Sequence, residues 1–265
     1  WVSLGISFQP SEVAKLGVIL SFAAMIARFG EKMETFRWGI APFAGVLAVI
    51  VVLLRLEPHN SAIVIIACTA GAMLFLGGVK YRWFILGGCA MLLGLSLVLG
   101  AGGYEASRIT AWQDPFSDPT DDGYQIIQSL YAIGSGGLFG LGFGQGRQKY
   151  LYLPEEHNDY IFSIACEELG LTGAAAILLL YALLILRGYW ISMHIRDRFL
   201  SLTVAGITTL TALQVFFNIG VVTNLLPSTG ISLPFFSYGG TALLIQLGEM
   251  GIILGASRQC SAGFL

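Results

Sequence analysis

Long apolar runs, almost free of charged residues, constrain this chain more than any other feature. A helix that crosses a membrane needs about 20 predominantly apolar residues. Seven stretches approach that length: 13–28, 38–55, 61–79, 83–101, 160–187, 202–224 and 239–257. Each run is too long and too continuously apolar for the strands of a membrane barrel. The sequence therefore predicts an all-α polytopic membrane protein with about seven transmembrane helices.

Composition supports this fold class and excludes several others. Charged residues are 11% of the chain and hydrophobic residues 55%, whereas soluble proteins carry about 25% charged residues. A disordered chain, a collagen-like repeat and a disulfide-rich secreted module are excluded. The formal net charge of −2, without a basic stretch, gives no support for nucleic acid binding. The cysteines have neither metal-ligand spacing nor a disulfide pattern.

The basic residues of the short loops predict the orientation in the membrane. One set of alternate loops, with the adjoining helix ends, holds Arg28, Lys32, Arg37, Lys80, Arg82, Arg187, Arg196, Arg198 and Arg258. The short loops of the other set hold only Arg55. Because basic loops stay in the cytoplasm, the first set is predicted to be cytoplasmic. Residues 102–159 would then form a large ordered extracytoplasmic loop within a single transmembrane domain over 1–265.

Acidic residues gather on the predicted outer side, and Glu12 at the start of the first span is one of them. Lys15 follows three residues later, on the same helix face and within pairing distance. The preference for acids in a first helical turn explains Glu12 but not Lys15. A lysine inside a membrane is costly and by default indicates function with a named partner. No Walker-type nucleotide loop occurs, so an enzyme here needs a substrate that brings its own energy.

Three acids mark the start of the fifth predicted span. Asn158 and Asp159 precede the apolar run and suit a helix cap, a role that can coexist with catalysis. Glu167 lies on nearly the same face, about 12 Å deeper at ~1.5 Å per residue, and Glu168 adjoins it. Carboxylates in lipid either pair with a cation or have raised pKa values. A proton path in a transporter therefore stays open beside an enzyme.

The sequence contexts of several other polar residues indicate function less specifically. Arg147 and Lys149 could bind a phosphate group or form a solvated basic turn. The segment 57–60 is expected to be a tight outer hairpin, in which His59 has no second histidine nearby to share a metal. Four polar residues lie inside the last two apolar runs: Gln214, Asn218, Gln246 and Glu249. We assign them no chemistry beyond hydrogen bonds between helices.

In order along the chain, several stretches resemble the SEDS family (shape, elongation, division and sporulation) of RodA, FtsW and SpoVE. They are Gln9–Lys15, Asp122–Ser129, Ala132–Gly137, Leu151–Phe162, Glu167–Gly170 and Leu226–Gly240. The resemblance covers essentially the whole chain. Family members usually have ten spans and the match starts at the fourth, so about three N-terminal helices are expected to be absent here.

The resemblance implies a peptidoglycan glycosyltransferase. The family polymerises lipid II into β-1,4-linked glycan strands at the outer face of the cytoplasmic membrane, in cell division, elongation or sporulation. Asp159 matches the family's essential acid, and Glu12 and Lys15 match a Glu–Lys pair. Arg108, Lys149 and Glu168 fall in matching stretches. As a hypothesis, Asp159 is the general base, while Lys15, Arg108, Arg147 or Lys149 stabilise the pyrophosphate leaving group.

The resemblance also implies partners and a candidate cofactor. Membrane lipids and a class B penicillin-binding transpeptidase are the expected partners, besides lipid II. No cofactor is certain; a divalent cation, Mg²⁺ or Mn²⁺, is the candidate for the pyrophosphate. Two other functions stay open, a flippase for lipid-linked precursors and a noncatalytic scaffold. An essential carboxylate in an outer loop would favour the polymerase, and one at mid-membrane would favour the flippase.

The sequence departs from the family pattern at three places. The usual His-Thr-Asp-Phe is His157-Asn158-Asp159-Tyr160, which keeps the acid. The usual Gln-Pro-Asp-Leu-Gly-Thr is replaced over residues 57–62 and loses both its acid and its glycine. The glycine usual before Leu-Leu-Pro is Asn224. The first two departures point weakly to the division and sporulation branch.

Overall fold

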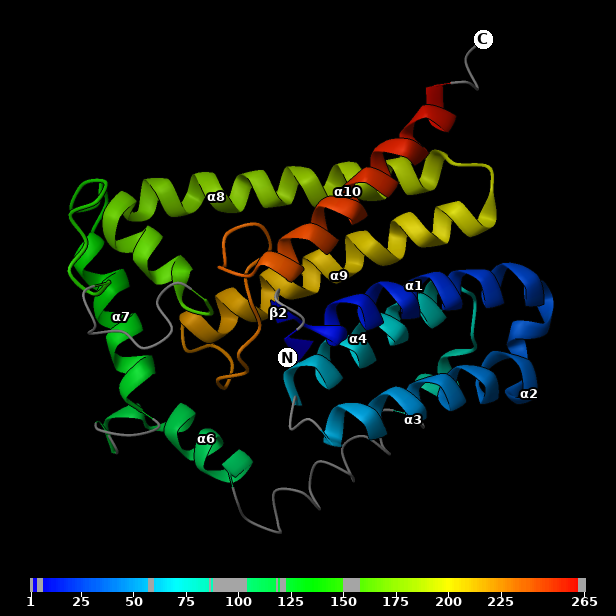
Figure 1. The fold of residues 1–265 in the computed structure, drawn as a ribbon, viewed down its shortest axis with the longest axis horizontal. Helices are drawn as coiled ribbons and strands as arrows, with labels where there is room; N and C mark the ends of the chain where they lie inside the picture. Colours follow the sequence, from blue (N-terminus) through cyan, green and yellow to red (C-terminus); the bar gives the residue numbers. More distant parts are fainter. Residues whose placement is uncertain are drawn as a thin grey trace. The chain divides into compact units, whose positions relative to one another are not determined.

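The computed structural model describes residues 2–3, 7–56, 60–85, 87, 104–117, 119, 123–149 and 158–261 (Figure 1). Two short strands, β1 (Val2–Ser3) and β2 (Ser7–Phe8), pair antiparallel. The other elements are helical: α1 (Pro10–Phe29), η1 (Gly30–Glu34), α2 (Phe36–Gly39), α3 (Ala41–Leu56), α4 (Asn60–Leu76), α6 (Tyr104–Gln113), η2 (Pro115–Ser117), α7 (Tyr124–Gly136), α8 (Ile161–His194), α9 (Arg198–Val222) and α10 (Gly240–Ser261).

Six of the seven predicted spans coincide with these helices, which confirms the all-α membrane fold. The stretches over α1, α2–α3, α8, α9 and α10 are long and apolar enough to cross a membrane, and α4 is a shorter apolar helix. The seventh predicted span, 83–101, falls largely outside the described residues. The predicted loop over 102–159 contains helices α6 and α7.

The chain forms two compact units. Unit 1 contains residues 1–87, 183–213 and 239–265, and unit 2 contains residues 88–182 and 214–238. In unit 1, α1 packs against α3, α4 and α10. The rings of Phe22 on α1 and Phe43 on α3 meet edge to face with centroids 4.8 Å apart.

Small residues let the helices of unit 1 approach closely. A Cβ at Gly206 of α9 would lie 2.7 Å from Ile19 of α1 and 3.1 Å from Met73 of α4. A Cβ at Gly188 of α8 would lie 2.3 Å from the Thr208 hydroxyl of α9. Small residues at such crossings are typical of helix packing in membranes, where van der Waals contact replaces the hydrophobic effect. They explain part of the glycine content, which is 34 of 265 residues.

In unit 2, buried hydroxyl groups join three helices. The Ser129 hydroxyl of α7 donates to the Val222 carbonyl of α9 at 2.8 Å and lies 3.1 Å from the Ser163 hydroxyl of α8. Both serines are fully buried. Buried hydroxyls of this kind need partners, and here they find them in each other and in a backbone carbonyl at a helix end. The contact fixes α7 against the first turns of α8.

Helix α8 changes direction at Gly170. The helix has 34 residues, about 51 Å at ~1.5 Å per residue, whereas the hydrocarbon core of a membrane is about 30 Å thick. Gly170 has φ 65° and ψ −167°, a conformation that is essentially restricted to glycine. The break divides α8 into 161–169 and 171–194. The second segment alone, about 36 Å long, is long enough to span the membrane.

Replacing Gly170 with alanine is expected to destabilise unit 2 by at least about 2 kcal/mol. The positive φ alone costs about 1–3 kcal/mol for a residue with a side chain, and the new Cβ would lie 2.3 Å from the Gly140 amide nitrogen. We expect a clear fall in the midpoint of thermal unfolding in detergent. Gly134→Ala is the matched control, because a Cβ there meets nothing within 4 Å. Equal midpoints for the two variants would contradict the account of the break.

Candidate functional site

A loop rich in glycine, residues 137–149 (the glycine loop), is bonded to the break in α8. The Leu141 and Gly142 amides donate to the carbonyls of Glu167 and Glu168 at 3.0 and 3.1 Å. In return, the amides of residues 171 and 172 donate to the carbonyls of residues 137 and 138. The break would otherwise leave these backbone groups without helical partners, and buried backbone groups need partners. The glycine loop therefore completes the hydrogen bonding of the interrupted helix.

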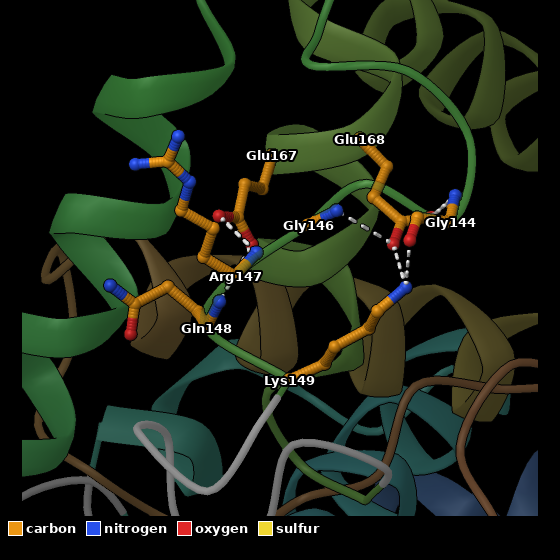
Figure 2. Close-up of polar contacts among 7 residues, drawn as sticks. All are labelled: Gly144, Gly146, Arg147, Gln148, Lys149, Glu167 and Glu168. Carbon is orange, nitrogen blue, oxygen red and sulfur yellow. Dashed lines mark hydrogen bonds and ion pairs between the residues drawn. The ribbon is translucent and has the colours of Figure 1, made fainter.

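The carboxylates of Glu167 and Glu168 hold the other half of the glycine loop (Figure 2). Glu167 accepts hydrogen bonds from the amides of Arg147 at 2.8 Å and Gln148 at 3.2 Å. Glu168 accepts from the amides of residue 144 at 2.9 Å and residue 146 at 3.3 Å. Glu167 is 1% exposed and Glu168 is 9% exposed. The two side chains therefore act as a paired anchor for the main chain of the loop.

This anchoring removes the observation that favoured a transporter. Glu167 and Glu168 were expected to lie in lipid, where unpartnered carboxylates suggest a proton path. Instead, backbone amides satisfy both side chains inside unit 2. Both carboxylates therefore have backbone partners, and the geometry suits fixed anchors for the main chain of the loop.

The two cations of the glycine loop differ in their surroundings. Lys149 pairs with Glu168 at 2.7 Å and donates to the Gly144 carbonyl at 2.8 Å. Arg147 is exposed, and its guanidinium points away from both carboxylates in Figure 2. Among the residues that the structure describes, the Arg147 guanidinium takes part in no ion pair. Arg147 is thus the loop cation that is open to an anionic ligand.

The turn that carries Asp159 is held through its backbone. The Asn218 side-chain amide of α9 donates to the Asp159 carbonyl at 2.7 Å and to the Ile231 carbonyl at 2.8 Å. The Ser237 hydroxyl donates to the Asn158 carbonyl at 2.7 Å. Asp159 itself is half-buried at the start of α8. The backbone of the turn is therefore held in place by the Asn218 and Ser237 side chains.

Sequence reasoning missed this supporting role of Asn218 and Ser237. Asn218 was expected to bond between helices, and it bonds to two loop carbonyls instead. The available signal was a polar residue in an apolar run, followed by a loop that contains proline and serine residues before the next span. That pattern does not identify the partner, because backbone carbonyls leave no trace in the sequence.

Arg108 and Tyr160 complete the surroundings of Asp159. Arg108, on α6, donates to the Ser228 carbonyl at 3.1 Å. Tyr160 is 2% exposed, and burial raises the pKa of its phenol; the Asp159 charge acts in the same direction and Arg108 opposes it. Both charged groups therefore lie within electrostatic reach of one phenol. Unit 2 brings the predicted acid and one predicted cation into the same neighbourhood.

Asn224 occupies a position that favours glycine. Its φ is 57°, in the left-handed region that asparagine tolerates better than most residues with a side chain. The family's usual glycine at this place has the same physical explanation. The Asn224 carbonyl accepts the Trp112 indole N–H at 3.1 Å, which ties the end of α9 to α6. The departure from the family pattern therefore preserves the turn.

The predicted pairing of Glu12 and Lys15 is confirmed in unit 1. The Lys15 ammonium lies 2.7 Å from Glu12 Oε2 and 2.8 Å from Oε1, and both residues are 7% exposed. Glu249 of α10 is buried within electrostatic reach of both. Lys15 is thus a buried cation that pairs with a carboxylate of its own helix and lies within electrostatic reach of another in a neighbouring helix.

Removing only one member of the buried pair is expected to cost more than removing both. Glu12→Ala should lower the midpoint of thermal unfolding by an amount equivalent to about 3 kcal/mol, because it leaves a buried charge poorly compensated. The double variant Glu12→Ala/Lys15→Met should recover much of the loss. Glu34→Ala, which breaks the exposed pair with Lys80, should change the midpoint little. A double variant less stable than Glu12→Ala would contradict this expectation.

Some predicted residues lie outside the part of the chain that the structure describes, and the predicted metal ion has no observed ligands to compare with. The hairpin over 57–60, with His59, and the acids Asp118, Asp121, Asp122, Glu155 and Glu156 lie wholly or largely outside the described residues. Within the described part of the chain, no group of three or more His, Cys, Asp or Glu side chains could hold a metal ion. The divalent cation, Mg²⁺ or Mn²⁺, therefore stays a prediction.

Together, these features define a multi-pass helical membrane protein with an acidic residue on a fixed turn and a glycine loop that presents a cation. A family model of cell cycle proteins, the FtsW/RodA/SpoVE family, matches residues 1–262. The chain belongs to this family, which is the SEDS family predicted from the sequence. Membership and the apolar helices place the chain in the cytoplasmic membrane.

Individual relatives show the same family. Stage V sporulation protein E of Bacillus subtilis (strain 168) is 42% identical over 260 residues, which are 97% of this chain and 71% of that protein. The probable peptidoglycan glycosyltransferase FtsW of Geobacter sp. (strain M18) is 40% identical over 260 residues, 98% of this chain and 71% of that protein.

Solved structures agree with the fold. A chain from a peptidoglycan synthase complex, described as coordinating polymerization and crosslinking, superposes with a TM-score of 0.82 at 29% identity. The alignment covers 97% of this chain and 72% of that chain. The rod shape determining protein RodA of Thermus thermophilus superposes with a TM-score of 0.66 at 28% identity, covering 97% of this chain and 68% of that chain.

Proposed function

We propose that this protein is a peptidoglycan glycosyltransferase that polymerises lipid II at the outer face of the cytoplasmic membrane. Relatives about 40% identical over nearly the whole chain are named probable peptidoglycan glycosyltransferases. The observation in the structure that carries the proposal is the Asp159 turn. Its carbonyls are held by Asn218 and Ser237, so the half-buried carboxylate has a fixed position from which to accept a proton.

In the proposed reaction, Asp159 takes the proton from the acceptor sugar hydroxyl as its oxygen attacks the anomeric carbon of the donor. The new glycosidic bond forms while the bond to the lipid pyrophosphate breaks, and the pyrophosphate leaves with the electron pair. Attack from the opposite face inverts an α-linked lipid sugar into a β-1,4 linkage. Two lipid-linked substrates held by one protein also gain from proximity.

Cationic side chains would stabilise the pyrophosphate leaving group. Arg108 and Arg147 are the candidates in unit 2, and Lys149 is a third that Glu168 positions through its ion pair. Lys15, held by Glu12, is the candidate in unit 1. Mg²⁺ commonly binds through substrate phosphates and few carboxylates, but no step of the proposed reaction runs through a metal ion.

We also infer a class B penicillin-binding transpeptidase as partner. A structural neighbour is part of a complex described as coordinating polymerization and crosslinking, and crosslinking is transpeptidase chemistry. The relatives include a stage V sporulation protein and probable peptidoglycan glycosyltransferases named FtsW, which supports a role in sporulation or cell division.

The direct test is the formation of glycan strands from purified lipid II by the purified full-length protein in detergent. The assay is run with and without the transpeptidase partner, whose own active-site serine is replaced so that strands stay uncrosslinked. Polymer that depends on the SEDS protein supports the proposal. A folded complex that makes no polymer, but moves labelled lipid II between leaflets of vesicles, would replace it with the flippase.

A further inference from the structure

The glycine loop turns its largest apolar side chains outward. Leu138 is 61% exposed, Phe139 81%, Leu141 41% and Phe143 87%. These four side chains are called the apolar crown. Soluble surfaces scatter apolar residues singly, whereas a contiguous group of this kind marks an interaction site. The crown is therefore expected to meet an apolar environment.

The crown cannot turn inward, because the inner side of the loop is occupied. A Cβ at Gly140 would lie 2.1 Å from the Glu168 carbonyl oxygen, so the loop main chain already touches α8. Glu167 and Glu168 hold the following residues through backbone amides, as Figure 2 shows. The exposure of the crown is thus imposed by bonds on the opposite side of the loop.

The position of the crown along α8 indicates what covers it. The Leu171 amide is bonded to the Gly137 carbonyl and the Thr172 amide to the Leu138 carbonyl. Residues 171 and 172 begin the segment of α8 that is long enough to span the membrane, and Leu171 is itself 61% exposed. The crown therefore continues the lipid-facing surface of α8 at the depth where that surface meets the membrane boundary.

We propose that the apolar crown inserts into the acyl region of the membrane leaflet next to residue 171, on the predicted extracytoplasmic side. Leucine and phenylalanine are the side chains that anchor interfacial elements below the headgroups. The glycine loop then has two attachments, the carboxylates of Glu167 and Glu168 on one side and lipid on the other. This inference concerns the placement of the loop and does not depend on the proposed enzyme activity.

Site-specific fluorescence in nanodiscs tests the insertion. Phe139→Cys and Phe143→Cys are made in the full-length protein after its native cysteines are replaced, and each is labelled with an environment-sensitive NBD group. Gln145→Cys is the matched control, because Gln145 is exposed on the same loop but lies outside the crown. The nanodiscs contain phosphatidylethanolamine and phosphatidylglycerol, with or without a phospholipid that carries a nitroxide on its acyl chain.

We expect NBD at positions 139 and 143 to emit at shorter wavelength and to be quenched several-fold more strongly by the nitroxide lipid than NBD at position 145. Equal and weak quenching at all three positions would place the crown in water and overturn the proposal. Weak quenching followed by shielding of 139 and 143 only when the transpeptidase is added would assign the crown to a protein partner instead. Unchanged thermal unfolding of each labelled variant confirms that the loop is compared in the same fold.

Discussion

Replacing Asp159 with asparagine is expected to lower glycan polymerisation by about 10²–10⁴-fold, the usual contribution of a positioned general base. Asparagine has nearly the shape of aspartate but cannot accept the proton of the attacking hydroxyl. The bonds that hold the turn involve the carbonyls of residues 158 and 159, which the substitution leaves in place. The backbone of the turn should therefore stay in place while the variant makes almost no polymer.

Asp114→Asn is the matched control for this experiment. Asp114 is an exposed acid that also belongs to unit 2, and the proposed reaction gives it no role. Its polymerisation rate should stay close to that of the unaltered protein. Full activity of Asp159→Asn, with polymer of normal length, would remove the general-base assignment and with it the main support for the mechanism.

Replacing Glu167 with alanine is expected to release the glycine loop. Each hydrogen bond to a charged group contributes about 1.5–3 kcal/mol, and Glu167 accepts two from the loop main chain. Because the loss is confined to one segment, it should appear as local opening rather than global unfolding. A loss of about 3 kcal/mol from the two hydrogen bonds should accelerate amide hydrogen exchange at Arg147 and Gln148 on the order of 100-fold.

Hydrogen exchange measured by mass spectrometry on peptides that cover 137–149 checks this expectation. Glu31→Ala is the control, because Glu31 is an exposed acid in unit 1. In Glu31→Ala, the peptides that cover 137–149 should exchange at the same rate as in the unaltered protein. Unchanged exchange in Glu167→Ala would show that the bonds between the loop and the carbonyls of α8 suffice and that the carboxylate is not the anchor.

The membrane helices were predictable because their signal is local and redundant. Any run of about 20 apolar residues must satisfy its own backbone as a helix in lipid, and α1, α3, α8, α9 and α10 follow from that alone. The Glu12–Lys15 pair was predictable for the same reason, since three-residue spacing on a helix fixes the contact. In each case the partners lie within one element, where geometry is known in advance.

The anchors of the site were not predictable, because their partners are backbone groups far away in the chain. Glu167 bonds to amides 19 and 20 residues earlier, and Asn218 bonds to a carbonyl 59 residues earlier. An acid in an apolar run has the same sequence signal whether it faces lipid, a cation or a loop. The glycines over 134–146 indicated a packed loop, but they could not indicate what it packs against.

The anchoring of the glycine loop by main-chain amides has a consequence for its sequence. Every residue except proline carries an amide N–H, so Glu167 can hold positions 147 and 148 whatever side chains stand there. The loop can therefore exchange side chains for new chemical properties without loosening its attachment, and Arg147 is the clearest instance. Proline is the exception, because at position 147 or 148 it would remove a donor that no side chain could replace.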